Sequence, residues 1–179
     1  MARFLTQLVV GLGSGLVGAL ALTAAHEGLR RSAPDSPRPK SPRLDVLGMR
    51  ALRSLAEAFG LKKPRGKELR RDALAGDLLA NTAWFGLAAG GRHPWVRGIS
   101  LGLLAGVGAL VLPPVLGLGR TPRSSIVRGQ TVGLFVLGGL AAAGVAWAIQ
   151  RASESRMLAQ ARAAAGDARV NARSSGMIH

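Results

Sequence analysis

Long apolar stretches without charge dominate the pattern of this chain. Residues 4–25, 98–119 and 129–150 contain no Asp, Glu, Lys or Arg over 22 residues each. About 20 helical residues cross the roughly 30 Å hydrocarbon core of a bilayer. The pattern therefore predicts three membrane-spanning helices, in segments 1–25, 97–119 and 129–150.

A fourth stretch, residues 72–91, is marginal by the same measure. Its apolar part, 73–91, contains Asp77, Asn81 and Thr82. One central Asp costs about 2.5–3.5 kcal/mol on the insertion scale, which offsets the gain of about 1.5–3 kcal/mol from the neighbouring apolar residues. We expect this stretch to cross the membrane as a hairpin with residues 98–119, and a re-entrant segment is the alternative.

The first apolar stretch has one feature of a secretory signal, because Arg3 precedes it. Its 22-residue apolar run exceeds the 7–15 residues that are usual for the apolar h-region of a signal peptide, and Arg30 and Arg31 follow as a stop signal. We therefore expect a retained helix.

The connection at 26–71 is basic and changes character along its length. It begins with a proline-rich run, and residues 44–59 then place Leu and Phe side chains on one helical face and arginines elsewhere. Such an amphipathic helix fits a membrane surface or a partner protein. The residues expected to meet anionic lipid headgroups are Arg30, Arg31, Arg50, Arg53, Lys62 and Lys63.

Lys and Arg are distributed unevenly between the predicted loops. With four spans, sixteen of them lie on one side of the membrane and eight on the other, so the first and third loops should be cytoplasmic. A three-span arrangement gives twenty against four, and the charge rule alone favours it. We favour four spans because Phe4, Trp95 and Trp147 then share one interface, and because a lipid-exposed irregular hairpin is disallowed.

The end of the chain, residues 151–179, is rich in Ala and Arg. We expect the last helix to continue into water as far as Ala165, with a loose tail from Gly166 onward.

Composition excludes several classes of function. The chain has no cysteine, so disulfides, thiolate metal sites and cysteine nucleophiles are impossible. The net charge of +15 is compatible with nucleic-acid binding, but aromatic residues are only 4% and Tyr is absent, so a base-stacking platform is not expected. We predict no metal, no cofactor and no enzymatic activity, since no acid, base and nucleophile set is evident.

Glycines recur at positions that suit helix packing. Gly13, Gly15 and Gly18 match the G-x-G-x-x-G pattern of dinucleotide folds, but the apolar run continues past them and no strand–helix alternation follows. Glycines four residues apart on a membrane helix let two backbones approach closely. The predicted packing positions are Gly11, Gly15, Gly98, Gly102, Gly106, Gly129 and Gly133.

Pro113 and Pro114 interrupt the third span. Proline removes a backbone donor and clashes with the preceding turn, so a kink or an early helix end is expected near Leu112.

The main polar group comprises His26, Glu27, Asp77 and Asn81. Two lie at the end of the first predicted helix and two at the start of the second, so they can meet on the cytoplasmic side. Ionisable groups at membrane depth indicate a proton relay or cation site. The structural alternative is that Asp77 pairs with Arg30, Arg31 or Arg71.

The chain resembles a group of uncharacterised small bacterial inner-membrane proteins. The resemblance rests on residues 26–31 (HEGLRR), 43–51 (RLDVLGMRA) and 76–81 (GDLLAN), and on the glycine-rich third and fourth spans. The group has no assigned activity, substrate or cofactor. The resemblance implies that Glu27, Asp45, Asp77 and Asn81 act together.

These observations predict an all-α membrane protein, a four-transmembrane-helix bundle with a cytoplasmic amphipathic interfacial helix. We expect it in the bacterial inner membrane, as a structural or accessory subunit that contacts anionic lipid and forms homo-oligomers or binds other membrane subunits. A small conduit for ions, protons or a solute, using the polar group, is the alternative.

Overall fold

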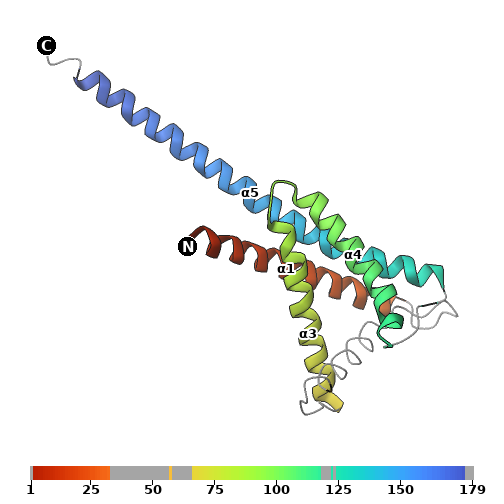
Figure 1. Cartoon of the computed structure of the whole chain (residues 1–179). Coiled ribbons are helices and arrows are strands. Elements are labelled where there is room, and N and C mark those ends of the chain that lie inside the picture. The colour runs from red at the N-terminus through yellow and green to blue at the C-terminus, as the bar shows by residue number, and fades with distance from the viewer. Residues whose placement is uncertain (1, 33–56, 58–65, 118–121, 123, 176–179) are drawn as a thin grey trace. The chain divides into compact units, whose positions relative to one another are not determined.

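All described elements of the chain are helical. The computed structural model describes residues 2–32, 57, 66–117, 122 and 124–175, and no strand occurs among them. The elements are α1 (Ala2–Arg31), α3 (Gly66–Gly86), the 3₁₀ helix η1 (Leu87–Ala89), α4 (Pro94–Val115) and α5 (Ser125–Ser175) (Figure 1). The predicted all-α class is confirmed.

Three of these helices are long and apolar enough to cross a membrane. They are Leu5–Arg31, Pro94–Val115 and Ser125–Gly166. The three segments predicted as spans without reservation are therefore helices whose length and composition suit a membrane. The marginal fourth stretch is a helix, so the count of four long helices matches, but α3 is not among these three. The interfacial helix predicted at 44–59 lies outside the described residues, apart from Glu57, which is helical.

Several helix ends differ from the sequence-based boundaries. α1 continues past residue 25 to Arg31, and α3 begins at Gly66, before the start predicted at residue 72. α5 continues to Ser175, whereas we expected a loose tail from Gly166. Ala and Arg are among the best helix formers, and one Gly costs only about 1 kcal/mol, so Gly166 does not end the helix.

The two prolines of α4 lie in its last turn. α4 continues through Pro113 and Pro114 and ends at Val115, close to the expected early end and before residue 119. The backbone N–H of Leu116 donates to the Leu112 carbonyl at 2.9 Å and closes the helix.

α1, α3, α4 and the first part of α5 share one apolar core. α1 packs against α3 and η1, and α4 packs against η1 and α3. Phe85, at the end of α3, is 0% exposed. The core cluster of buried residues is Leu22, Phe85, Ala88, Leu134, Phe135 and Ala142.

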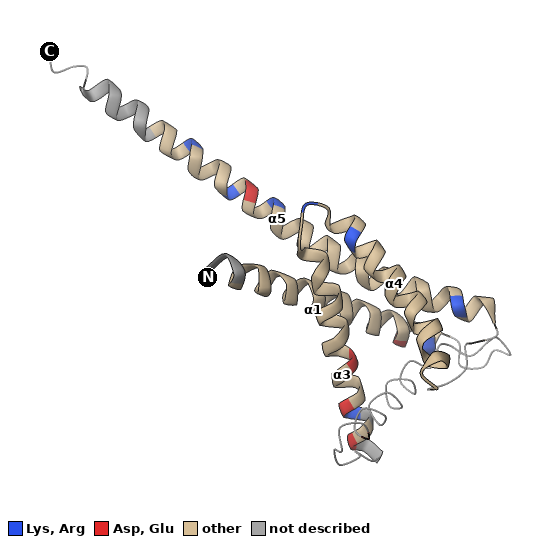
Figure 2. Cartoon of the chain, viewed as in Figure 1, with Lys and Arg blue, Asp and Glu red and all other residues tan. Residues whose placement is uncertain are grey.

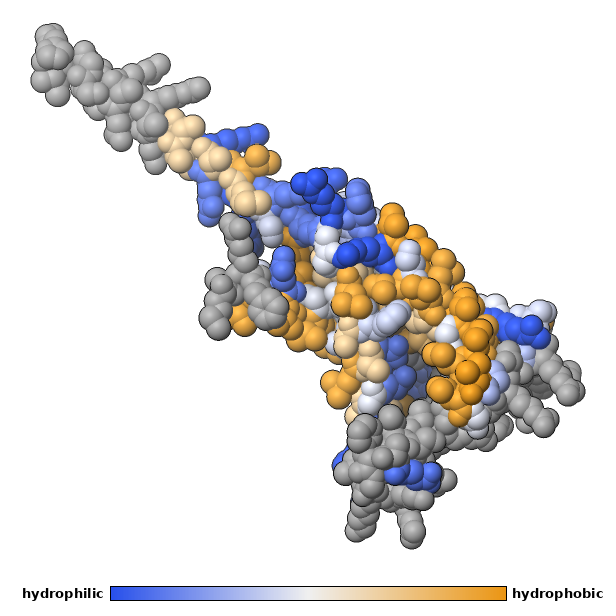
Figure 3. All heavy atoms as spheres, viewed as in Figure 1, coloured by the Kyte–Doolittle hydropathy of each residue, from blue (hydrophilic) through white to orange (hydrophobic). Residues whose placement is uncertain are grey.

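Apolar side chains also cover the outside of these helices. Val9 on α1, and Leu104 and Val115 on α4, are among the large exposed hydrophobic residues. Apolar residues dominate α4 on the face shown in Figure 3. Charged residues lie mainly on the first half of α3, at helix ends and on the second half of α5 (Figure 2). This distribution suits helices that meet lipid along their length.

The chain divides into two compact units, Met1–Ala146 and Trp147–His179. In the second unit, the Arg151 guanidinium lies 5.1 Å from the centre of the Trp147 ring. This is within the range of a cation–π contact.

Candidate functional site

α4 and α5 meet through glycine backbone. A Cβ atom placed on Gly102 would lie 2.6 Å from Val136 Cα, and one on Gly106 would lie 2.8 Å from Val132 Cα. A Cβ on Gly98 would overlap the carbonyl oxygen of Gly139. Each contact is too short for any side chain, so the two helices approach closely only because these positions lack a Cβ. The order of the contacts shows that α4 and α5 are antiparallel.

α1 and α3 also cross through small residues. A Cβ on Gly15 would overlap the Thr82 carbonyl oxygen and would lie 2.7 Å from Gly86 N. A Cβ on Gly86 would lie 2.8 Å from the Gly11 carbonyl oxygen. The last turn of α3 therefore lies against the middle of the α1 span, and these two helices are antiparallel as well.

Gly18 of α1 contacts both α5 and the Phe85 side chain of α3. A Cβ on Gly18 would lie 2.6 Å from the Gly138 carbonyl oxygen and 3.2 Å from Phe85 Cβ. A Cβ on Gly138 would in turn lie 2.9 Å from the Phe85 ring. The Phe85 ring thus occupies space that two glycines, one on α1 and one on α5, leave open.

Gly129 and Gly133 are placed differently from the other predicted packing glycines. A Cβ on either would meet no atom within 4 Å, and both residues are exposed. They therefore take no part in helix contacts within the described chain. α5 instead presents Gly138 and Gly139, because the rotation of α5 about its axis turns that face toward its neighbours.

The predicted polar group divides into two sets. In the first, the Asn81 side-chain amide donates to the Asp77 carboxylate at 3.1 Å, one turn along α3. His26 of α1 interacts electrostatically with the same carboxylate. The structure therefore brings together His26, Asp77 and Asn81, which come from two helices.

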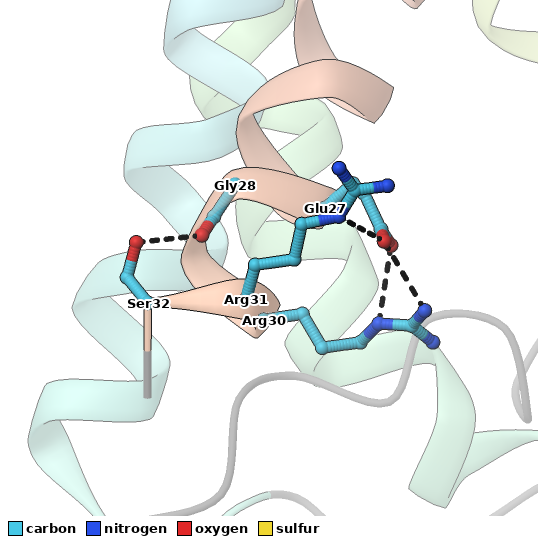
Figure 4. A network of polar contacts seen from close by, with 5 residues as sticks. All are labelled: Glu27, Gly28, Arg30, Arg31 and Ser32. Carbon is cyan, nitrogen blue, oxygen red and sulfur yellow. Dashed lines mark hydrogen bonds and ion pairs between the residues drawn. The ribbon is translucent and has the colours of Figure 1, made fainter. Parts of the chain in front are cut away.

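In the second set, Glu27 pairs with arginines of its own helix. Its carboxylate lies 3.1 Å from Arg30 Nε and 2.9 Å from Arg31 Nε (Figure 4). The Ser32 hydroxyl donates to the Gly28 carbonyl at 2.9 Å in the same turn. Arginines also complement the partial negative charge at the C-terminus of a helix. Glu27 thus stabilises the end of α1, and Arg30 and Arg31 are not paired with Asp77.

The basic residues predicted to meet lipid headgroups are only partly described. The side chains of Arg30 and Arg31 are 51% and 79% exposed while paired with Glu27. The remaining four, Arg50, Arg53, Lys62 and Lys63, lie outside the described residues. Arg71 forms an ion pair with Asp72 at 3.5 Å.

Few polar side chains are buried among the described residues. Ser14 donates to the Gly11 carbonyl at 3.0 Å, and Thr131 donates to the Val127 carbonyl at 2.8 Å. The hydroxyl of Thr82 has no hydrogen-bond partner, although Thr82 is only 8% exposed. These hydroxyls are bound within their own helix or unpaired.

A side-chain hydrogen bond links α3 to α4. The indole Nε1 of Trp84 donates to the Leu101 carbonyl at 3.0 Å. This bond fixes the last turns of α3 beside the first half of α4.

Within the described ranges, no group of three or more His, Cys, Asp or Glu side chains is arranged to hold a metal ion. The set formed by His26, Asp77 and Asn81 offers one imidazole, one carboxylate and one amide.

Comparisons with known proteins do not assign the chain to a family. No protein-family model matches the sequence, and no significant match exists among curated proteins or solved structures.

Several residues with close contacts were missed by the sequence rule for glycine pairs. Gly138 and Gly139 are adjacent, and each is followed four residues later by alanine, at Ala142 and Ala143. Counting alanine as a small residue would have selected this face of α5. The hydrogen bond of Trp84 could not be predicted from the sequence, because it depends on the position of α4.

Proposed function

We propose that this chain is a non-enzymatic subunit of a membrane assembly, with four membrane-spanning helices, in the inner membrane of a bacterium. The observation that carries the proposal is the glycine-mediated packing of α1, α4 and α5. In lipid, close packing of this kind drives helix association, because the hydrophobic effect does not favour contact between two apolar helices there. The described interior is therefore a scaffold of backbone contacts, and the surfaces that remain for function face lipid and partners.

The buried hydroxyls support a structural role. Those of Ser14 and Thr131 bond to carbonyls of their own helices, so neither is directed across the bundle toward a substrate. The charged side chains of α1, Glu27, Arg30 and Arg31, pair with one another at its end.

Purification at native abundance in a mild detergent tests the proposal. The expected result is a particle larger than the 18.5 kDa chain with its bound detergent, containing further copies or other subunits. Migration as a lone monomer, with no co-purifying protein, would contradict it.

The number of spans is tested separately by single-cysteine labelling. Because the chain has no native cysteine, Ser32→Cys, His93→Cys, Ser124→Cys and Ser155→Cys each provide one reactive site. With four spans, an impermeant maleimide labels positions 32 and 124 from one side and 93 and 155 from the other. If α3 does not cross, positions 32, 93 and 155 share a side and only 124 differs.

A small conduit for protons, cations or a solute is the second candidate. The interaction of His26 with the Asp77–Asn81 pair favours it, since a relay needs titratable groups near one another. The test is flux into proteoliposomes across a panel of cations. Absence of flux in the unmodified protein, or unchanged flux in Asp77→Asn, would exclude the conduit.

A further inference from the structure

Two exposed arginines lie close together in the chain where α3 gives way to α4. Arg92 lies in the connection, and Arg97 lies in the first turn of α4. Neither takes part in the ion pairs found among the described residues. Residues 1–26 and 78–153 contain no Asp or Glu, and Figure 2 shows no acidic residue on α4. No carboxylate of η1, α4 or the adjoining apolar stretches therefore balances this positive charge.

The Arg97 guanidinium is directed away from the apolar part of α4. The neighbouring side chains of Val96 and Ile99 are 65% and 40% exposed, which suits a surface that meets hydrocarbon. The guanidinium instead lies over the connection that precedes the helix. A Cβ atom on Gly90 would lie 3.0 Å from Arg97 Nη1, and one on Gly91 would lie 3.1 Å from it. A long basic side chain near the end of a span places its charge at the membrane surface in this way.

Two glycines leave room for this guanidinium. Gly91 has a φ of +138°, which residues with a side chain rarely adopt. Gly90 has an ordinary φ of −80°, but a side chain there would meet Arg97. Arg97 is exposed although it lies against this backbone, so its N–H donors remain open to a ligand. Those donors form a planar fork that matches two oxygens of a phosphate.

Trp95 indicates the level of this group in a bilayer. Its side chain is 42% exposed, and its ring lies 3.6 Å from the Cβ position of Gly144 on α5. Tryptophan is enriched where the hydrocarbon core meets the headgroups. At that level the anions that a membrane supplies are the phosphates of its lipids, and anionic lipids concentrate there around basic residues.

We propose that Gly90, Gly91, Arg92, Trp95 and Arg97 form a binding site for the phosphate of an anionic phospholipid. Arg97 binds the phosphate, Arg92 adds charge beside it, and the Trp95 ring packs against the same lipid. The inference goes beyond the proposed function. It requires that α4 crosses the membrane, but it requires neither a partner subunit nor a crossing by α3.

Quenching by brominated lipid tests the site. Trp84→Phe combined with Trp147→Phe leaves Trp95 as the single tryptophan of the chain. This protein is reconstituted into phosphatidylcholine vesicles that contain brominated phosphatidylcholine or brominated phosphatidylglycerol, and the quenching gives the relative affinity of the two lipids beside Trp95. We expect phosphatidylglycerol to bind about fivefold more strongly. The unmodified chain should show the same preference with a smaller amplitude, so the result does not depend on the double variant.

Variants separate the site from general attraction by a basic protein. Arg97→Gln should lower the ratio of affinities to about twofold or less. Gly90→Val keeps every charge but places a side chain where the guanidinium lies, so it should lower the ratio as well. The matched control is Arg128→Gln, which removes one charge at the start of α5, where the Arg128 guanidinium donates to the Pro122 carbonyl at 2.8 Å. This control should leave the ratio unchanged.

Several outcomes would overturn the proposal. Equal affinities for the two lipids in the unmodified chain would do so, as would a full preference in either Arg97→Gln or Gly90→Val. If inorganic phosphate added at constant ionic strength removes the preference, the site binds a soluble anion and the proposal is wrong. Circular dichroism of each variant shows whether the helices are intact, and the two variants reach the same loss by different routes. A missing preference in a particle that is still larger than a monomer would remove this inference and leave the proposed function standing.

Discussion

The α4·α5 pair and the α1·α3 pair both pack through small residues, but they differ in how apolar their two helices are. α4 and α5 are both long and apolar enough to span a membrane. Three glycines of α4 lie against the α5 backbone over more than two turns. α3 is not among the candidate spans, and the glycines of α1 meet its backbone at Thr82 and Gly86, in its last two turns. The first pair can form from its own two helices, whereas α3 depends on its neighbours.

The difference shows how a marginal helix is held in a bundle. α3 contributes one large side chain, Phe85, to the core, and it donates one indole hydrogen bond, from Trp84, to α4. Both lie near the crossing with α1. The first half of α3 carries most of its charge (Figure 2), and it also buries Leu69 and Ala73. The one α3 side chain in the main core cluster and the indole bond to α4 thus both lie near Gly86.

The largest effect is expected for Phe85→Ala, which would break the attachment of α3. Removing a fully buried Phe leaves a cavity, so the free energy of unfolding should fall by about 3 kcal/mol or more. SDS titration in mixed micelles, followed by tryptophan fluorescence, measures the loss. Leu79→Ala on the same helix is the control, because Leu79 is 70% exposed and should change stability by about 0.5 kcal/mol or less. Equal effects of the two variants would contradict the central role of Phe85.

Gly102→Ala tests the α4·α5 pair. The added Cβ would lie 2.6 Å from Val136 Cα, in backbone that cannot move aside locally, so we expect a loss of about 1–3 kcal/mol in the same titration. The matched control is Gly133→Ala on α5, whose Cβ would meet open space and which should be neutral or slightly stabilising. A destabilising Gly133→Ala together with a tolerated Gly102→Ala would mean that α5 presents the opposite face to α4.

Trp84→Phe removes the hydrogen bond between α3 and α4 while keeping an aromatic ring. The expected cost is about 0.5–1.5 kcal/mol. Because Trp84 is one of the fluorescent residues, the comparison is followed by helical circular dichroism during SDS titration. No loss of stability would show that the bond to the Leu101 carbonyl adds nothing to the attachment of α3.

The smallest effect is expected for Thr82→Val. The Thr82 hydroxyl is buried without a partner, so replacing it with a methyl group should stabilise the protein by about 1 kcal/mol or less. Thr131→Val is the contrasting variant, since it loses the bond to the Val127 carbonyl and should cost about 0.5–1 kcal/mol. The same sign for both variants would show that the Thr82 hydroxyl is paired in the membrane.

The spans could be predicted from the sequence because partition into hydrocarbon is a local property. Residues 98–119 and 129–150 carry no charge, and no tertiary contact is needed to see that they suit lipid. The behaviour of α3 was not predictable in this way. Its attachment depends on Phe85 fitting between Gly18 and Gly138, which come from two other helices.

The candidate polar residues could be selected from the sequence, but their partners could not. The spacing of Asp77 and Asn81 by one turn indicates a contact, and the structure contains it. Glu27 was grouped with Asp77 in the prediction, but it pairs with Arg30 and Arg31, which reflects local geometry at the end of α1. For the glycines, four-residue spacing identifies a close-packing face, but only the rotation of each helix decides which face is used, as Gly133 and Gly139 illustrate.

The short connection between α3 and α4 bears on how the protein is made. Only residues 90–93 separate η1 from α4, and Gly91 adopts a φ of +138°, a conformation that suits glycine. A ribosome would therefore deliver the weakly apolar α3 to the insertion machinery only a few residues before the strongly apolar α4. If α3 crosses the membrane as proposed, the two helices would enter the bilayer as one folded pair, and a longer or stiffer connection would leave α3 outside it.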